Sequence, residues 1–181
     1  MLDNDLIRAF LPILTQGLID YGIGSVTVRQ AYQPTQTGTE SLPVITFFKV
    51  SDSRPPWAKK LDFYDFGDDQ YKHEERQVYE TVFQMNSLAA QNPADVNSLT
   101  ASDILNTALA VMQSDTTIQK LKSQEIGILK VSDIRNVPFV DDRDQFEYSP
   151  SFDFTLRHLQ QRTAPTDFIT EFDQNIFPVT C

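Results

Sequence analysis

The sequence has few of the residues on which most catalytic and metal sites depend. Its 181 residues include one cysteine, Cys181, and two histidines, His73 and His158. A single thiol excludes an intrachain disulfide and a cluster of thiolate ligands, and it is typical of a reducing compartment. The two histidines share no ligand spacing, and a pair alone makes a poor zinc site even if their strands were neighbours. We therefore expect no bound metal.

Glycine is scarce as well, and it forms none of the patterns that bind nucleotides. The six glycines make neither a GxGxxG nor a P-loop, and no GxSxG marks a hydrolase serine. The dipeptide His73-Glu74 begins like a zinc-protease helix, but position 77 is not a histidine. An EF-hand in the acidic stretch fails because Phe146 and Glu147 occupy positions that need a ligand and a glycine. The sequence predicts no catalytic residue and no cofactor.

Long apolar runs and excess positive charge are also missing. No stretch of about 18 apolar residues is long enough for a transmembrane helix. Asp3 and Asp5 have the wrong sign for a signal peptide, so we expect synthesis in a cytoplasm. The 15 basic residues face 25 acidic ones, giving a net charge of -10. Such a surface repels phosphate, which argues against a general nucleic-acid binder.

What the chain does contain is enough apolar material for one folded core. Apolar residues make up 40% of the sequence, with 13 Phe and 6 Tyr. A chain of this length predicts one domain that buries roughly 70% of its unfolded surface. We find no internal repeat and no linker between two cores.

Hydrophobic periodicity predicts helices grouped before and between runs of strands. Residues 5–21 have apolar side chains every three or four positions, with Pro12 expected to kink the helix or divide it. A second helix should begin after Thr100, where Asp103 completes a capping box, and a short third helix should follow Ser114. This grouping predicts an α+β fold, a single domain with one mainly antiparallel sheet and two or three helices packed on one face.

The strands are predicted from alternation and from β-branched or aromatic runs. They are expected at residues 26–29, 43–50, 60–66, 74–88, 126–134 and 152–156, with 136–150 as a connection. In 74–88, the face with Tyr79, Thr81, Phe83 and Met85 is the better candidate for the core.

Loop-like segments contain the remaining aromatic residues. Polar or proline-rich loops are predicted at 31–42 and 53–60, and the tail 163–181 shows no clear period. Trp57 follows Pro55-Pro56, so it is either tucked under its loop or presented to a partner. Phe139, Phe168, Phe172 and Phe177 also lie in loop-like contexts, and a second subunit could bury them.

Four blocks resemble the neck or tail terminator proteins of tailed bacteriophages. They are SLPVITFFKVSDSRPPW (41–57), VYETVFQMNSL (78–88), TASDILNTALAVMQS (100–114) and IGILKVSDIRNVPFVDDRDQFEYSPSFDFTL (126–156). Together they cover most of residues 40–160, and the DDRDQFEYSPSFDF stretch is the most specific. The resemblance implies one terminator-like domain over 1–181.

A structural role in the virion is what this resemblance implies. Such proteins form a ring, usually of six subunits, that ends tube polymerisation and joins the tail to the head connector, without catalysis or cofactor. The implied partners are other copies of the chain, the tail tube protein and the head-side connector, with DNA passing through unbound and no membrane involved. Another head–tail connector or a tail-completion protein is the alternative, and a small phage-encoded hydrolase is a third reading.

Two sets of residues are candidates for roles in such a ring. Acidic side chains in the channel would keep DNA from sticking, because like charges repel within about 8 Å; the alternative is an outer, solvated surface. The channel candidates are Asp65, Asp68, Asp69, Asp141, Asp142 and Asp144. Ring closure needs two different patches that meet, and the interface candidates are Arg54, Trp57, Arg135, Phe139 and Arg143. Ion pairs within the chain are the alternative for the arginines.

Overall fold

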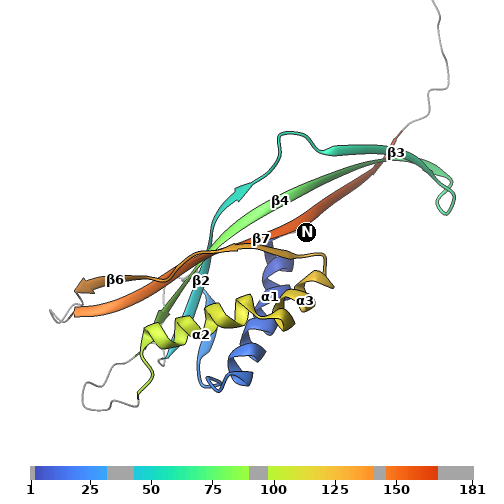
Figure 1. Cartoon of the computed structure of the whole chain (residues 1–181). Coiled ribbons are helices and arrows are strands. Elements are labelled where there is room, and N and C mark those ends of the chain that lie inside the picture. The colour runs from blue at the N-terminus through green and yellow to red at the C-terminus, as the bar shows by residue number, and fades with distance from the viewer. Residues whose placement is uncertain (1–2, 32–42, 90–97, 141–145, 167–181) are drawn as a thin grey trace, which may run out of the picture.

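The computed structural model describes residues 3–31, 43–89, 98–140 and 146–166 as three helices and seven strands (Figure 1). In chain order these are α1 (Asp3–Asp20), β1 (Thr27–Gln30), β2 (Val44–Ser53), β3 (Lys59–Asp65), β4 (Gln70–Leu88), α2 (Ala101–Gln113), α3 (Asp115–Lys122), β5 (Gly127–Val131), β6 (Arg135–Val140) and β7 (Phe146–Pro165).

Strands β4 and β7 are the longest, and their pairing organises the sheet. Their antiparallel ladder joins residues 72–86 of β4 to residues 151–165 of β7. Strands β2 and β3 pair with the other edge of β4, and β5 and β6 pair with the other edge of β7, all antiparallel. Only β1 is parallel to its neighbour, β2, among the described strands. The predicted α+β fold with one mainly antiparallel sheet is confirmed.

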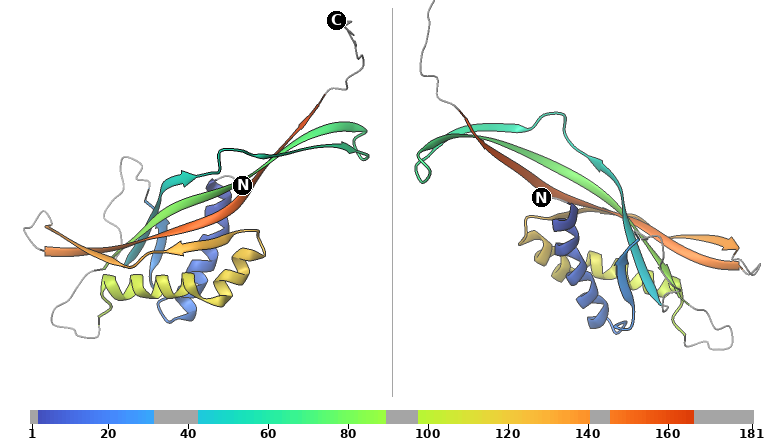
Figure 2. Two further views of the ribbon diagram at one scale, coloured as in Figure 1. Left: turned by 45° about the horizontal axis from the view of Figure 1, so that its top comes forward. Right: turned by 180° about the vertical axis from the view of Figure 1, so that it is seen from behind.

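The three helices lie on one side of this sheet (Figure 2). Helix α1 contacts α2 and α3, α2 also packs on β4 and β7, and α3 packs on β5. No helix in the described ranges is long and apolar enough to cross a membrane.

Phenylalanine rings fill the space between α1 and the sheet. The ring centroid of Phe10 lies 5.0 Å from that of Phe47, 5.4 Å from Phe83 and 5.6 Å from Phe154. All four side chains are buried, and burial of each stabilises the fold by about 1.5–3 kcal/mol. Phe83 and Phe154 are cross-strand partners, which is why their rings stack.

The predicted core face of β4 is correct for its inner half. Thr81, Phe83 and Met85 are buried, whereas the intervening Val82 and Gln84 are partly exposed. Successive residues of a strand point to opposite faces of the sheet. The buried residues 81, 83 and 85 therefore all point to the face that the helices cover.

Helix α1 is one continuous helix that includes Pro12, which excludes the division into two short pieces, one of the two expected outcomes. It ends where Gly22 adopts a φ of 85°. The N–H of Gly22 donates to the carbonyl of Ile19, and the N–H of Ile23 donates to that of Leu18. This is a Schellman cap, and its left-handed residue favours glycine.

The predicted capping box of α2 is present, and the predicted short helix α3 also begins with a cap. Thr100 accepts from the N–H of Asp103, and the Asp103 carboxylate accepts from the N–H of Thr100, so the capping box is complete. Ser114 accepts from the N–H of Thr117 and begins α3. Local sequence therefore fixes where both helices start.

One end of the β4–β7 ladder continues beyond the helices as a three-stranded extension (Figure 1). We call it the arm, and it consists of β3, residues 70–76 of β4 and residues 161–165 of β7. At the opposite end, β6 pairs with the first residues of β7.

Two strand predictions were wrong in their limits. Residues 136–140, expected in a connection, belong to β6 (Arg135–Val140), and Ile134 lies between β5 and β6. Strand β7 runs from Phe146 to Pro165 and so includes the start of the supposed tail. Partner strands supply the hydrogen bonds in both places, and the local pattern does not reveal them.

Helix α1 approaches α2 closely at Gly17, which makes a specific packing prediction. A Cβ built at Gly17 would lie 2.3 Å from Cγ1 of Val111, which is buried. We expect Gly17→Ala to lower the free energy of unfolding by about 1–3 kcal/mol through overpacking, despite its better helix propensity. Urea unfolding measures this change. In a Val111→Ala background the same substitution should be neutral or stabilising; an equal loss in both backgrounds would contradict the contact.

Candidate functional site

The predicted interface residues do not form one cluster. Arg54 and Trp57 lie between β2 and β3, and the Trp57 side chain is 86% exposed. Arg135 lies in β6, on the other side of the β4–β7 pair, and donates to Asp153 at 2.8 Å. Phe139 belongs to β6, and Arg143 lies outside the described residues. The interface role of these residues stays a prediction.

Three of the predicted channel acids gather at the turn between β3 and β4. The ammonium of Lys72 contacts Asp65 at 2.6 Å and also contacts Asp68. The hydrogen bond from Lys72 and that from the N–H of Gly67 lower the pKa of Asp65. The hydroxyl of Tyr64 donates to Asp69, whose φ is 54°. The turn therefore combines three carboxylates with one bound lysine.

The remaining acids, Asp141, Asp142 and Asp144, lie outside the described residues. Whether either acidic group faces a channel stays a prediction.

Aromatic side chains surround the same turn, a feature that the sequence analysis missed. The Tyr64 ring lies 5.0 Å from the rings of Phe66 and Tyr71, in edge-to-face geometry. Phe66 is 89% exposed. Tyr64 and Tyr71 are cross-strand partners, and the alternation of β3 and β4 was the signal that could have placed them together.

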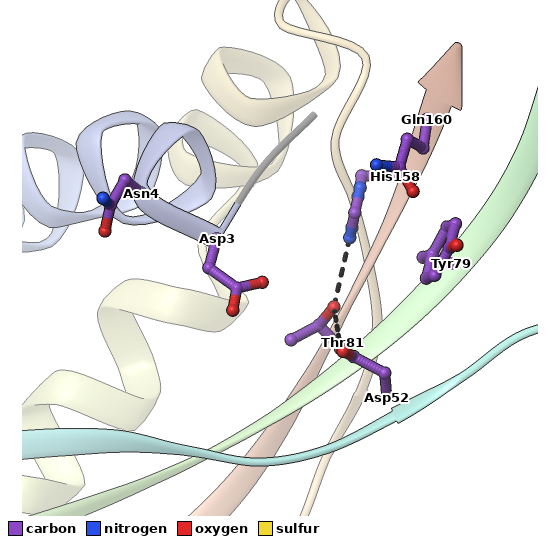
Figure 3. A pocket seen from close by; sticks show the side chains of 7 residues that line it. All are labelled: Asp3, Asn4, Asp52, Tyr79, Thr81, His158 and Gln160. Atoms are coloured by element: carbon purple, nitrogen blue, oxygen red, sulfur yellow. Dashed lines mark hydrogen bonds between the residues drawn. The ribbon is translucent and has the colours of Figure 1, made fainter. Parts of the chain in front are cut away.

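A polar hollow of about 450 Å³ lies where the apolar core ends, at the start of α1 (Figure 3). Helix α1, β2, β4 and β7 each contribute to its wall. The lining residues are Asp3, Asn4, Asp52, Tyr79, Thr81, His158 and Gln160. The sequence analysis named none of them as a site except His158, which it considered only as a ligand.

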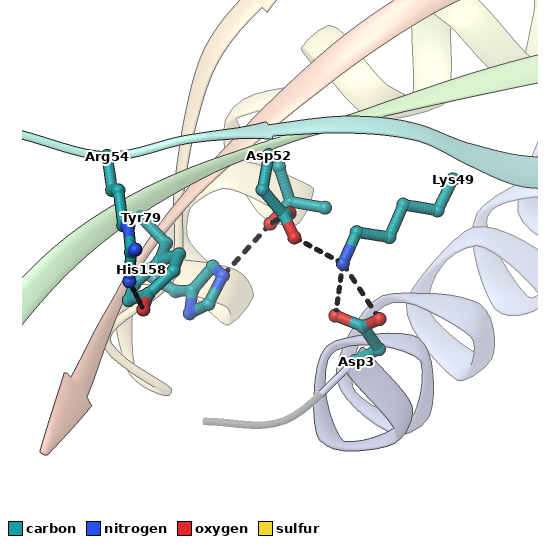
Figure 4. A network of polar contacts seen from close by, with 7 residues as sticks. Asp3, Lys49, Asp52, Arg54, Tyr79 and His158 are labelled. Carbon is teal, nitrogen blue, oxygen red and sulfur yellow. Dashed lines mark hydrogen bonds and ion pairs between the residues drawn. The ribbon is translucent and has the colours of Figure 1, made fainter. Parts of the chain in front are cut away.

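Ion pairs around Lys49 connect the helix to the sheet beside this hollow (Figure 4). Its ammonium lies 2.8 Å from both carboxylate oxygens of Asp3 and 2.5 Å from Asp52. Burial by itself would raise the pKa of Asp52, but hydrogen bonds from Lys49 and Thr81 outweigh it, so that pKa is lowered. Lys49 therefore holds the first turn of α1 against β2.

The hydrogen bonds of Thr81 define the state of His158. The Thr81 hydroxyl donates to Asp52 at 2.8 Å, and Nε2 of His158 lies 3.1 Å from the hydroxyl oxygen of Thr81. Because the hydroxyl has one proton, Nε2 must be the donor to Thr81, and Nδ1 is then the unprotonated nitrogen. Nδ1 is buried and has no hydrogen-bond partner among the described residues.

The hydrogen bonds from His158 to Thr81 and from Thr81 to Asp52 hold these side chains in place and do not activate the Thr81 hydroxyl as a nucleophile. A histidine base would need to accept the hydroxyl proton, whereas Nε2 here carries its own proton. The imidazole also stacks on Tyr79, with ring centroids 5.7 Å apart, and Arg54 donates to the Tyr79 hydroxyl at 3.2 Å. Burial lowers the pKa of His158, so the ring is held neutral.

The two histidines do not meet. His158 pairs with Tyr79 on β4, whereas His73 lies six positions further along the same strand, about 20 Å away at 3.3 Å per residue. His73 contacts Asp62 and lies 3.6 Å from Glu75, and the bond to Asp62 raises its pKa. No group of three or more metal-binding side chains occurs in the described part of the chain.

Comparison with known proteins finds one family model and a distant structural likeness. A family model described as "E217 gateway protein gp29" matches residues 5–168. No curated protein matches. The solved structure described as "Cryo-EM Structure of an Extracellular Contractile Injection System, PVC sheath/tube terminator in extended state" matches with a TM-score of 0.47 and 10% identity, over 96% of this chain and 64% of that chain. A likeness this distant supports no conclusion about function.

The buried neutral histidine predicts a specific pH dependence. The unfolded chain, with an ordinary histidine pKa near 6.5, binds a proton more readily than folded His158. Stability from this residue is therefore complete above pH 6.5 and is lost as the pH falls below that value. Between pH 7.5 and pH 5.5, urea unfolding should show a larger loss for the wild type than for His158→Gln, which keeps a donor near Thr81.

The matched control is His73→Gln. Because the folded pKa of His73 is raised, His73 adds stability below its unfolded pKa, and this is lost as the pH rises through the folded pKa. His73→Gln should therefore lose more free energy of unfolding than the wild type between pH 7.5 and pH 5.5. Parallel pH profiles for the wild type and His158→Gln would contradict the assignment of a neutral, buried His158.

Proposed function

The chain belongs to the E217 gateway protein gp29 family of structural phage proteins, and on that basis we propose that it forms a ring at the neck of the virion. The resemblance to phage neck or tail terminator proteins is confirmed at the level of the family. In the proposal, six copies close a ring at the head-proximal end of the tail. The ring ends tube polymerisation and binds the tube on one side and the head connector on the other.

The match over residues 5–168 is the observation that carries this proposal, because it includes all of the described fold except the first two residues of α1. The arm is a physical argument in the same direction. A narrow ribbon that extends beyond its helices has two uncovered faces and gains stability by packing against another subunit. Trp57 and Phe66, at the two ends of β3, are 86% and 89% exposed and offer apolar surface for that contact.

A second candidate function is a head–tail connector or tail-completion protein that does not control tail length. The family description names a gateway and does not mention termination. Both candidates allow DNA to pass through a central channel without specific binding. The protein would have the same classes of virion protein as partners under both candidates. The two candidates differ only in whether this protein stops the polymerisation of the tail tube.

The ring is tested by native mass spectrometry of the purified protein over a range of concentrations. We expect a six-fold species whose population rises with concentration. Trp57→Ala should shift the population toward monomers, because it removes a large exposed apolar side chain. Leu129→Ala, which removes an exposed apolar side chain from the edge strand β5, is the matched control. A monomer at all concentrations, even with purified tail tubes added, would contradict the ring.

The terminator role is tested in phage that lack the protein. If the ring stops the tube, electron microscopy of such lysates should show tails of uncontrolled length that are not joined to heads. Complementation with the wild-type chain should restore uniform tails. Unattached tails of normal length would exclude the terminator role and favour the connector.

A further inference from the structure

Two hollows follow one another along the helix-side face of β4 and β7. The first is the polar hollow described above, and the second, smaller one is lined by Ala58, Glu75, Gln77, Tyr79, Gln160 and Arg162. Tyr79 and Gln160 line both, so the two hollows adjoin, and together we call them the groove. Ala58 follows Trp57 directly, so the backbone of the exposed Trp57 lies next to the smaller hollow.

Positive charge predominates around the outer part of this groove. Lys60, Glu75 and Arg162 form one row across the three strands of the arm. Lys60 reaches Glu75 at 3.8 Å, and Arg54 donates to the neutral hydroxyl of Tyr79. Within the described ranges, neither Arg54 nor Arg162 has a carboxylate within 4.0 Å. At the smaller hollow, Arg162 and Glu75 line the wall, and Lys60 and Arg54 add two cations beside it through Glu75 and Tyr79. The carboxylates of the larger hollow, Asp3 and Asp52, are both paired with Lys49.

The end of the chain has complementary chemistry. Residues 167–181, DFITEFDQNIFPVTC, contain three acidic residues and three phenylalanines but no lysine, arginine or histidine. They follow Thr166, whose N–H donates to the carbonyl of Tyr71 at 2.9 Å, at the outer end of the arm. Fifteen residues span up to about 50 Å when extended, so the segment can reach well beyond the end of the arm.

We propose that residues 167–181 of one copy bind in the groove of the next copy, between Arg54 and Arg162 and over Trp57. The inference rests on the proposed ring. Acidic side chains of the segment pair with the three cations, and its phenylalanines cover the indole. Groove and segment are different patches of one chain, so the contact is heterologous, and a closed ring leaves no groove empty.

Trp57 is the only tryptophan in the chain, so its fluorescence reports on this contact. One chain keeps Trp57 but carries Phe168→Ser, Phe172→Ser and Phe177→Ser. The second chain is Trp57→Phe with an intact segment, and it has no tryptophan signal. When the two full-length chains are refolded together from urea, we expect the Trp57 emission to move to shorter wavelength.

The matched control replaces the second chain by one that carries both Trp57→Phe and the three serine substitutions, and it should leave the emission unchanged. Charge reversal tests the electrostatic part. Lys60→Glu with Arg162→Glu in the first chain should weaken the contact about tenfold. Lys120→Glu with Lys122→Glu on α3 makes the same charge change away from the arm and should have no effect. Asp167→Lys, Glu171→Lys and Asp173→Lys in the second chain should restore binding to the reversed groove.

The oligomer mass, measured on the same mixtures, separates the two proposals. Closed oligomers with unchanged Trp57 emission would overturn the docking of the segment and leave the ring intact. A mixture that stays monomeric at every concentration would overturn the ring. In the wild type, the Trp57 emission could lie at shorter wavelength at every dilution, while mixing the two variant chains causes no change. This result would mean that the segment binds the groove of its own chain, and it would overturn docking between copies.

Discussion

The antiparallel pairing of β4 with β7 is the constraint on which the rest of the structure depends. Its register places Phe83 opposite Phe154 and Met85 opposite Phe152, so the apolar side chains of both strands reach the helices together. A shift by one residue would turn each of these sets to the opposite face. The same ladder continues for several residues beyond the helices, and the arm therefore inherits its position from the pairing that forms the core.

Along this ladder one face of the sheet changes from apolar to polar at the point where α1 begins. Phe83 lies under the helix, Thr81 takes part in the hydrogen bonds to Asp52 and His158, and Tyr79 lines the hollow. The helix starts at Asp3, whose ion pair with Lys49 fixes it to β2. A buried polar group is costly unless it is hydrogen-bonded or ion-paired. In the network of Asp3, Lys49, Asp52, Thr81 and His158, Nδ1 of His158 is the one buried polar side-chain atom without a partner among the described residues.

The arm has the features of a surface that is completed by another molecule. No helix lies against its strands in the views of Figures 1 and 2, an exposed tryptophan precedes its first strand, and Lys60 and Arg162 lie on the strands themselves. Cross-strand contacts such as that of Lys60 with Glu75 support it from within. Exposed pairs of this kind contribute little, so a partner subunit would add most of the stability. The proposed ring and the proposed docking of residues 167–181 both follow from this imbalance.

The sequence by itself determined the features that depend on neighbouring residues: the helix caps at Thr100 and Ser114, the alternation of β4, the α+β class and, through whole segments, the family. Only the tertiary structure decided which distant residues meet. Lys49 and Asp3 are 46 positions apart, and Thr81 and His158 are 77 apart; neither pair has a local signal. Strand β6 and the arm were hidden for the same reason, because strand pairing is set by hydrogen bonds to partners far away in the chain.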